Sequence, residues 1–299
     1  MLSACVFSGI LYGVEMMVLL PFHLTVLTIL VREKEFRNKS AYRIMIHMSI
    51  CECLQTIGYI LASIMSIAQT LMHPYVPTIG GAFLSATWIG IVLFIFLLTL
   101  NRFMVFANLS AAKPTENRFI SRSIFLIWTI CAVIFGAHLT PQLTMVYIVE
   151  KNTYWFGNKL SVLVGTAESY FICGTLLVTF VVCVATVITI IIKRNLFTTQ
   201  FKVSIVEIKL FLQTLFIFSY LTAIRCMWLF GESLLTTEAS YIVLAFATQA
   251  IGGLNPLLYL LFNKGIRRHF KRYMGFSTST VFVQVVDKRS KQTCRSIQQ

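Results

Sequence analysis

Seven stretches of this chain are apolar over a length that can cross a lipid bilayer, and this feature constrains the fold more than any other. A helix needs about 20 apolar residues to span the hydrocarbon core of a membrane. With edges defined to within a few residues, the stretches are 7–31, 41–71, 80–107, 122–148, 163–193, 204–230 and 239–263. The sequence therefore predicts an all-α membrane protein, a bundle of seven transmembrane helices.

The composition agrees with a lipid environment. Of the 299 residues, 57% are hydrophobic and 12% are charged. In a typical soluble chain just under half of the residues are apolar and about a quarter are charged. One soluble core of this size does not need so many apolar side chains, so the excess must face lipid. The net charge of +14 is divided among short clusters between the apolar stretches. A nucleic-acid-binding protein would gather it on one folded face, and we exclude that class.

The positions of the basic residues predict the orientation of the bundle. All Lys and Arg residues except Lys151, Lys159 and Arg225 lie in or beside the first, third and fifth connecting segments, or in the carboxyl-terminal segment. Basic residues in short loops mark the cytosolic side of a membrane protein. We therefore expect an extracellular amino terminus and a cytosolic carboxyl terminus.

The chain after the last stretch divides into two parts. In 264–276, apolar residues recur at helical spacing opposite a basic face, which is typical of a helix that lies in the interface on anionic lipid. The apolar positions are Ile266, Phe270, Tyr273 and Met274. We expect a bundle over 1–263, an amphipathic juxtamembrane helix over 264–276 and a polar cytosolic tail over 277–299.

Two local patterns give the bundle a functional meaning. The last stretch contains Asn255-Pro256-Leu-Leu-Tyr259, and the third ends in Asn101-Arg102-Phe. Pro256 removes a backbone hydrogen bond and kinks a helix, and a neighbouring Asn can satisfy the freed groups. Together with the basic helix that follows, these segments resemble the Asn-Pro-x-x-Tyr and Asp-Arg-Tyr motifs of rhodopsin-like G-protein-coupled receptors.

Further segments are similar to the nematode serpentine chemoreceptors, especially class T and its relatives. The resemblance extends from residue 41 to about 270. It is carried by Ala41-Tyr42-Arg43-Ile44-Met45-Ile46, His73-Pro74, Trp88, Leu100-Asn101-Arg102, Tyr154-Trp155-Phe156 and Asn263-Lys264-Gly265-Ile266-Arg267. It implies a chemosensory receptor of the plasma membrane that binds a small extracellular ligand and activates a heterotrimeric G protein.

The resemblance also implies roles for individual residues. Arg102 would pair with an acidic residue in the inactive receptor and contact the G protein in the active one, and Glu207 is a candidate partner. Asn101, Asn255, Pro256 and Tyr259 would belong to the same switch. An Arg at this depth could equally extend its charge to the membrane surface without a signalling role.

The chain departs from the superfamily at three points. Residues 72–90 and 149–162 contain no Cys, so the usual disulfide between the third span and the second extracellular loop is absent. The fifth span has no Pro, and the sixth has no Cys-Trp-x-Pro element. We therefore do not transfer the sixth-helix toggle to this chain.

Glu52 lies near the middle of the second stretch, where an ionisable group costs about 2.5–3.5 kcal/mol on insertion scales. The receptor resemblance implies a polar network of Glu52, Ser49 and Asn255 that holds a sodium ion or water. The alternative is a protonated Glu52 that donates one hydrogen bond to backbone. Three histidines, His23, His47 and His138, show no metal-ligand spacing, and we expect no other metal or cofactor.

A second set of residues is expected near the extracellular side. Glu168 and Arg225 fall at similar depths in the fifth and sixth stretches, and they could form a ligand-contacting pair, a structural pair or no pair. The ligand-binding candidates, which could equally be an interfacial aromatic belt, are Phe83, Trp88, Glu168, Tyr170, Arg225, Trp228, Tyr241 and Gln249.

Two other classes of seven-span protein remain as alternatives. A secondary transporter or ion-conducting protein should show repeated halves and interrupted helices, and no such repeat is visible. A membrane enzyme would need clustered His and acidic ligands, which the sequence does not show. We expect a receptor and no catalytic site, and the oligomeric state is not predicted.

Overall fold

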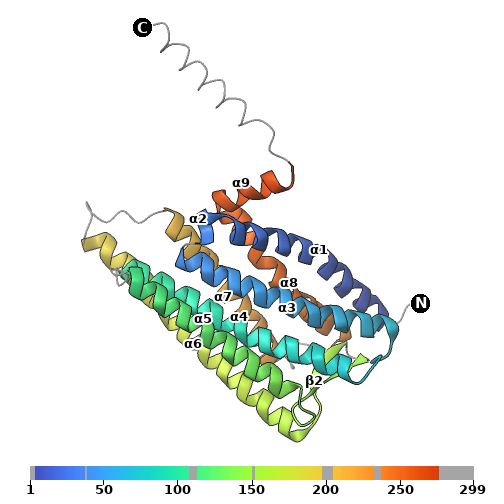
Figure 1. Ribbon diagram of the computed structural model, residues 1–299. Coiled ribbons are helices and arrows are strands. Elements are labelled where there is room, and N and C mark those ends of the chain that lie inside the picture. The colour runs from blue at the N-terminus through green and yellow to red at the C-terminus, as the bar shows by residue number, and fades with distance from the viewer. Residues whose placement is uncertain are drawn as a thin grey trace, which may run out of the picture.

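The computed structural model describes six segments of the chain: 4–37, 39–107, 113–149, 152–196, 205–231 and 237–275. Long helices run side by side, a short helix crosses them at one end, and a β-hairpin lies at the other (Figure 1). We name these the α9 end and the hairpin end. The expected tail over 277–299 lies outside the described residues.

The described residues contain seven helices that are long and apolar enough to cross a membrane. The elements in order are α1 (Ala4–Arg32), α2 (Lys34–Arg37), α3 (Ser40–Ala68), α4 (Tyr75–Ala107), α5 (Lys113–His138), β1 (Met145–Ile148), β2 (Thr153–Phe156), α6 (Lys159–Leu196), α7 (Ile205–Phe230), α8 (Glu238–Phe262) and α9 (Lys264–Tyr273). The seven predicted spans and the short helix after them are confirmed.

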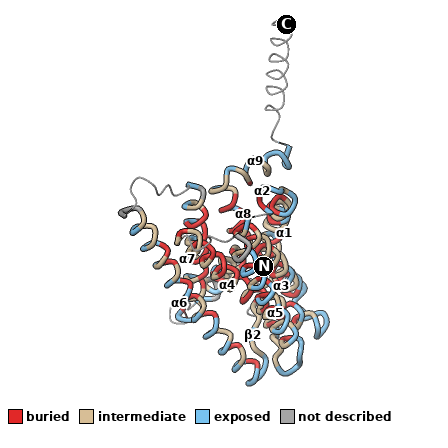
Figure 2. Tube along the Cα trace, turned by 60° about the vertical axis from the view of Figure 1, so that its left-hand side comes forward, coloured by how far each residue is buried: buried red, intermediate tan, exposed pale blue. Residues whose placement is uncertain are grey.

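The central helix is α4, which packs against α3, α5, α6 and α7. In its most apolar window 61% of the residues are buried inside the bundle, against 22% in α5 and α6. Figure 2 shows the consequence, since buried residues lie where helices face one another and exposed residues follow the outer faces. Leu177, Phe180 and Val181 of α6 are among the exposed apolar residues, and a seven-span bundle presents such faces to lipid.

The fourth span begins at Lys113 and ends at His138, so both of its ends lie earlier in the chain than the predicted limits of 122 and 148. We expected a helix to residue 148, but α5 ends at His138 and β1 begins at Met145. Pro141 has no backbone N–H and disfavours helix in the residue before it, while the apolar composition continues into β1. A prediction from hydropathy alone therefore includes the strand in the same span as the helix.

The hairpin is antiparallel, with Met145 opposite Phe156 and Ile148 opposite Thr153. A buried network of hydrogen bonds ties it to the bundle. Ser66 of α3 lies 2.5 Å from the Tyr147 hydroxyl and donates to Asn152 Oδ1 at 2.7 Å. Asn152 Nδ2 in turn donates to Ser8 Oγ of α1 at 2.5 Å. Burial raises the pKa of Tyr147 to about 12, so its hydroxyl stays protonated and can donate.

The turn between α8 and α9 is fixed by Asn263, whose backbone is extended. Its Oδ1 accepts from the backbone N–H groups of Gly265 and Ile266 at 2.9 and 3.2 Å, so it is the N-cap of α9. Beyond this cap Ile266 is buried and Phe270 packs edge-on against Phe22 of α1 at 5.6 Å. The helix ends at Tyr273, a little before the predicted limit of 276.

Candidate functional site

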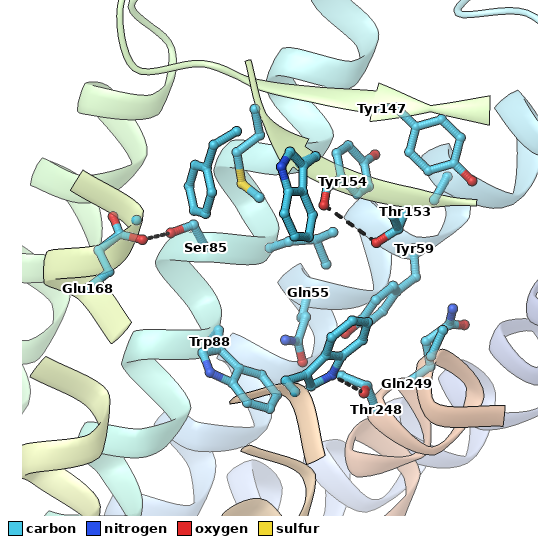
Figure 3. Close-up of a pocket in the computed structure, with 18 of the residues that line it drawn as sticks. Gln55, Tyr59, Ser85, Trp88, Tyr147, Thr153, Tyr154, Glu168, Thr248 and Gln249 are labelled. Carbon is cyan, nitrogen blue, oxygen red and sulfur yellow. Dashed lines mark hydrogen bonds between the residues drawn. The ribbon is translucent and has the colours of Figure 1, made fainter. Parts of the chain in front are cut away.

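A cavity of about 360 Å³ opens into the bundle at the hairpin end. Helices α1, α3, α4, α6, α7 and α8 and the hairpin all contribute to its wall. In the close-up the amide of Gln55 lies between Trp88 and Tyr59, with Gln249 on the neighbouring helix and the hairpin across the top (Figure 3). Its size and its mixture of aromatic and polar side chains are those of a small-molecule site.

The structure divides the predicted ligand-binding candidates into two groups. Those that line the cavity are Trp88, Glu168, Arg225, Trp228 and Gln249.

The other three candidates lie outside this lining. Phe83 instead packs against Phe135 of α5, with ring centroids 4.8 Å apart. Tyr170 and Tyr241 are 76% and 41% exposed and point away from the helix contacts, because a helix register that turns one residue inward turns its neighbours outward. The structure therefore does not bring these three residues to this cavity.

Sequence reasoning missed the other half of the wall. Tyr12 of α1 and Gln55 and Tyr59 of α3 line the cavity, and so do Tyr154 and Trp155 of β2. The aromatic run at residues 154–156 in a short connecting segment was the available signal. Nothing in a linear sequence says that this segment folds back over the bundle.

Glu168 pairs with His138 rather than with Arg225. Its Oε1 lies 2.8 Å from His138 Nε2, and its Oε2 accepts a hydrogen bond of 2.8 Å from Ser85. His138 Nδ1 lies 2.8 Å from the carbonyl oxygen of Leu143. No ion pair joins Glu168 and Arg225, both of which the structure describes, so the pairing alternative is wrong.

Arg225 is left without that partner. Its Nε and Nη2 atoms are buried and make no hydrogen bond to any described residue. The same holds for Oε1 of Gln249 on the facing helix. In the same cavity wall, Trp228 Nε1 donates to Thr248 Oγ1 at 3.0 Å and joins α7 to α8.

A second polar cluster lies deeper, around Glu52. Asn255 Nδ2 of α8 donates to Glu52 Oε1, so the structure brings these two predicted residues together. Ser49, one turn earlier on α3, is also buried. His23 of α1 completes the cluster, with Nε2 3.2 Å from Glu52 Oε2 and Nδ1 2.7 Å from the Gly252 carbonyl oxygen.

The cluster contains a donor set that suits a hard cation. Glu52 Oε2, Ser49 Oγ and Asn255 Oδ1 are buried oxygens, and the one described polar atom given as an ion-pair partner of Glu52 Oε2 is His23 Nε2 at 3.2 Å. Hard cations take carboxylate, carbonyl and hydroxyl oxygens. The imidazole of His23 borders the same carboxylate, so a protonated His23 would compete with an ion for it.

At the α9 end, Arg102 of α4 contacts Glu207 of α7 through Nη1 and Oε2. The Arg102 side chain is 2% exposed, and Asn101 beside it is also buried. Both residues and Glu207 line a second cavity of about 360 Å³ that also reaches Tyr42 and Glu116. The remaining switch residues lie within α8, where Pro256 is inside the helix and Tyr259 is fully buried.

Comparison with known proteins supplies the identity of this bundle. The family model described as serpentine type 7TM GPCR chemoreceptor Srt matches residues 4–281, and no curated protein sequence matches the chain. The crystal structure of squid rhodopsin superimposes with a TM-score of 0.73 at 12% sequence identity, covering 92% of this chain and 86% of rhodopsin. The structural likeness shows a rhodopsin fold, and the family match favours a receptor over the transporter alternative. The chain belongs to the Srt family of serpentine seven-transmembrane, G-protein-coupled chemoreceptors.

Proposed function

We propose that this chain is a plasma-membrane receptor that binds a small extracellular ligand at the hairpin end and activates a heterotrimeric G protein at the α9 end. In this orientation the amino terminus and the hairpin are outside, and α9 lies on the anionic inner leaflet. The basic residues support it, because those of α9 and of the α1–α2 junction gather at one end of the bundle and basic residues favour the cytosolic side. No catalytic reaction is part of the proposal.

The contact between Arg102 and Glu207 carries the signalling part of the proposal. It joins α4, the central helix, to α7 beside a cavity at the α9 end. A buried guanidinium that loses the carboxylate it contacts becomes costly, so the contact favours the packing in which α4 and α7 stay together. A ligand that favours the other packing shifts the population toward a state in which Arg102 and the cavity are open to a G protein.

The test is basal activation of G protein by Glu207→Gln in cells, normalised to the receptor at the cell surface. Removing the carboxylate charge should raise basal activation several-fold over the parent. Glu116→Gln is the matched control, because Glu116 lines the same cavity but accepts a hydrogen bond from Ser40 at 2.6 Å. Equal basal activation in the parent and both variants would contradict the role of the contact.

A sodium ion is a further part of the proposal. The oxygens of Glu52, Ser49 and Asn255 would hold it between α3 and α8. An ion there supplies a positive charge to the buried carboxylate, and it would favour the helix packing in which these oxygens lie together. His23 would limit its binding when protonated.

A further inference from the structure

The cavity at the hairpin end has an unbalanced charge. Of the described residues that line it, Glu168 and Arg225 are the two with carboxylate or basic side chains. The carboxylate oxygens of Glu168 are both used, one by His138 and one by Ser85. A cationic ligand would therefore share this carboxylate with His138 and Ser85, each of which takes one acceptor site on its oxygen.

The His138–Glu168 pair adds no net charge. The Leu143 carbonyl can only accept, so His138 Nδ1 must carry a hydrogen. The 2.8 Å contact between Nε2 and Glu168 Oε1 needs one more proton between the two atoms. With that proton the pair is an imidazolium and a carboxylate, or two neutral groups, and in either form its charges cancel.

Arg225 therefore provides the uncompensated charge of the described lining. Two of its guanidinium nitrogens are buried without a hydrogen-bond partner among the described residues. Buried donors of this kind lose hydration without compensation, and those of charged groups lose the most. A rotation of this long side chain would turn them into the cavity, where a planar carboxylate can accept two parallel hydrogen bonds from a guanidinium.

The rest of the wall defines the remainder of the ligand. Trp88, Trp228 and Tyr154 line the cavity and offer flat apolar surface. Gln249 Oε1 is a buried acceptor without a donor among the described residues, one helix away from Arg225. A single Arg balances one negative charge, so a phosphate with about two charges at neutral pH would leave charge unpaired in a small site.

On the basis of the proposed receptor function, we infer that the ligand is a small monocarboxylic acid with an aromatic or aliphatic body, whose carboxylate binds Arg225 and whose hydrogen-bond donor, where it has one, meets Gln249.

The test uses the full-length receptor purified into phosphatidylcholine nanodiscs and measures the midpoint of thermal unfolding. The probes are matched sets in which one body carries a carboxylate, a primary amide or an amine. Suitable bodies are benzyl, 3-phenylpropyl, hexyl and 4-hydroxybenzyl. A ligand that binds only the folded state raises the midpoint in proportion to its occupancy.

At least one acid should raise the midpoint, and its amide and amine should not at equal concentration. Arg225→Gln should weaken the apparent affinity for that acid about 10- to 100-fold, from the worth of a hydrogen bond to a charged group. Arg225→Lys keeps the positive charge but loses the planar guanidinium group. Its apparent affinity for the acid should lie between those of the parent and Arg225→Gln. Lys159→Gln is the control, because Lys159 is exposed near the same end and does not line the cavity.

Preferential stabilisation by amines, stabilisation by none of the acids, or an unchanged acid response in Arg225→Gln would overturn the inference. If Arg225→Gln does not fold, the apparent affinity for the acid is compared between the parent and Arg225→Lys instead. An equal affinity in these two receptors would then overturn the inference. The Glu207→Gln measurement separates this failure from failure of the receptor proposal, since raised basal activation does not depend on which ligand fits the cavity.

Discussion

Asn152 in the hairpin turn and Ser66 in α3 form a buried hydrogen bond of 2.7 Å, and through it the hairpin is fastened to the bundle beside the cavity at the hairpin end. Rhodopsin-like receptors usually join the second extracellular loop to the third span by a disulfide, and residues 72–90 and 149–162 of this sequence contain no Cys. The polar network performs the same mechanical task, because it joins the hairpin to α3 and α1. Its members are buried, so their hydrogen bonds matter more than those of a surface loop.

Asn152→Ala should therefore lower the stability of the receptor. The substitution leaves the hydroxyls of Ser8 and Ser66 without their amide partner, at a cost of about 1–3 kcal/mol. We expect a lower midpoint of thermal unfolding and faster proteolysis within the hairpin. Gln142→Ala, at an exposed position in the same connection, should leave both unchanged, and equal values for the two variants would show that the network does not hold the hairpin.

His138 and Glu168 should behave as a coupled pair. Replacing either with Leu leaves a buried polar partner behind, whereas replacing both removes the pair as a unit. In a double-mutant cycle on thermal stability, the sum of the stability losses of the two single variants should exceed the stability loss of the double variant. We expect a coupling energy of about 1–3 kcal/mol. Additive losses would mean that the 2.8 Å contact contributes nothing to stability.

Asn263 should be required for the position of α9. Its side chain caps α9 and its Nδ2 donates to the Tyr42 hydroxyl of α3 at 2.6 Å. Asn263→Ala loses both contacts and should destabilise the helix by about 1 kcal/mol or more. Hydrogen exchange in 264–273 should become faster, while Tyr42→Phe, which keeps the cap, should show a smaller change. Unaltered exchange in both would contradict the anchoring role.

Sodium should stabilise the parent through Glu52. In NaCl the midpoint of thermal unfolding should be higher than in choline chloride at equal ionic strength, and Glu52→Gln should remove most of the difference. Glu15→Gln is the comparison variant, because Glu15 is an acidic residue of α1 that makes no contact with this cluster among the contacts described. A sodium response that survives in Glu52→Gln would place the ion elsewhere or exclude it.

Much of the fold could be predicted because a bilayer imposes length and composition on each span. Those signals also caused the error in the fourth span, where an apolar strand follows a helix with only a short turn at Pro141. The contact of Glu52 with Asn255 was foreseeable because an ionisable group at mid-membrane needs a partner. The partner of Glu168 was not, because His138 and Ser85 lie on other helices and helix rotation decides which side chains meet. Phe83, Tyr170 and Tyr241 lie outside the lining of the cavity for the same reason.

The most direct test of the signalling mechanism is a cryo-electron microscopy structure of the receptor bound to a nucleotide-free heterotrimeric G protein. The proposal predicts that Arg102 is separated from Glu207 and that the G protein occupies the cavity beside Asn101 at the α9 end. An intact Arg102–Glu207 contact in that complex, or a G protein bound at the hairpin end, would contradict it.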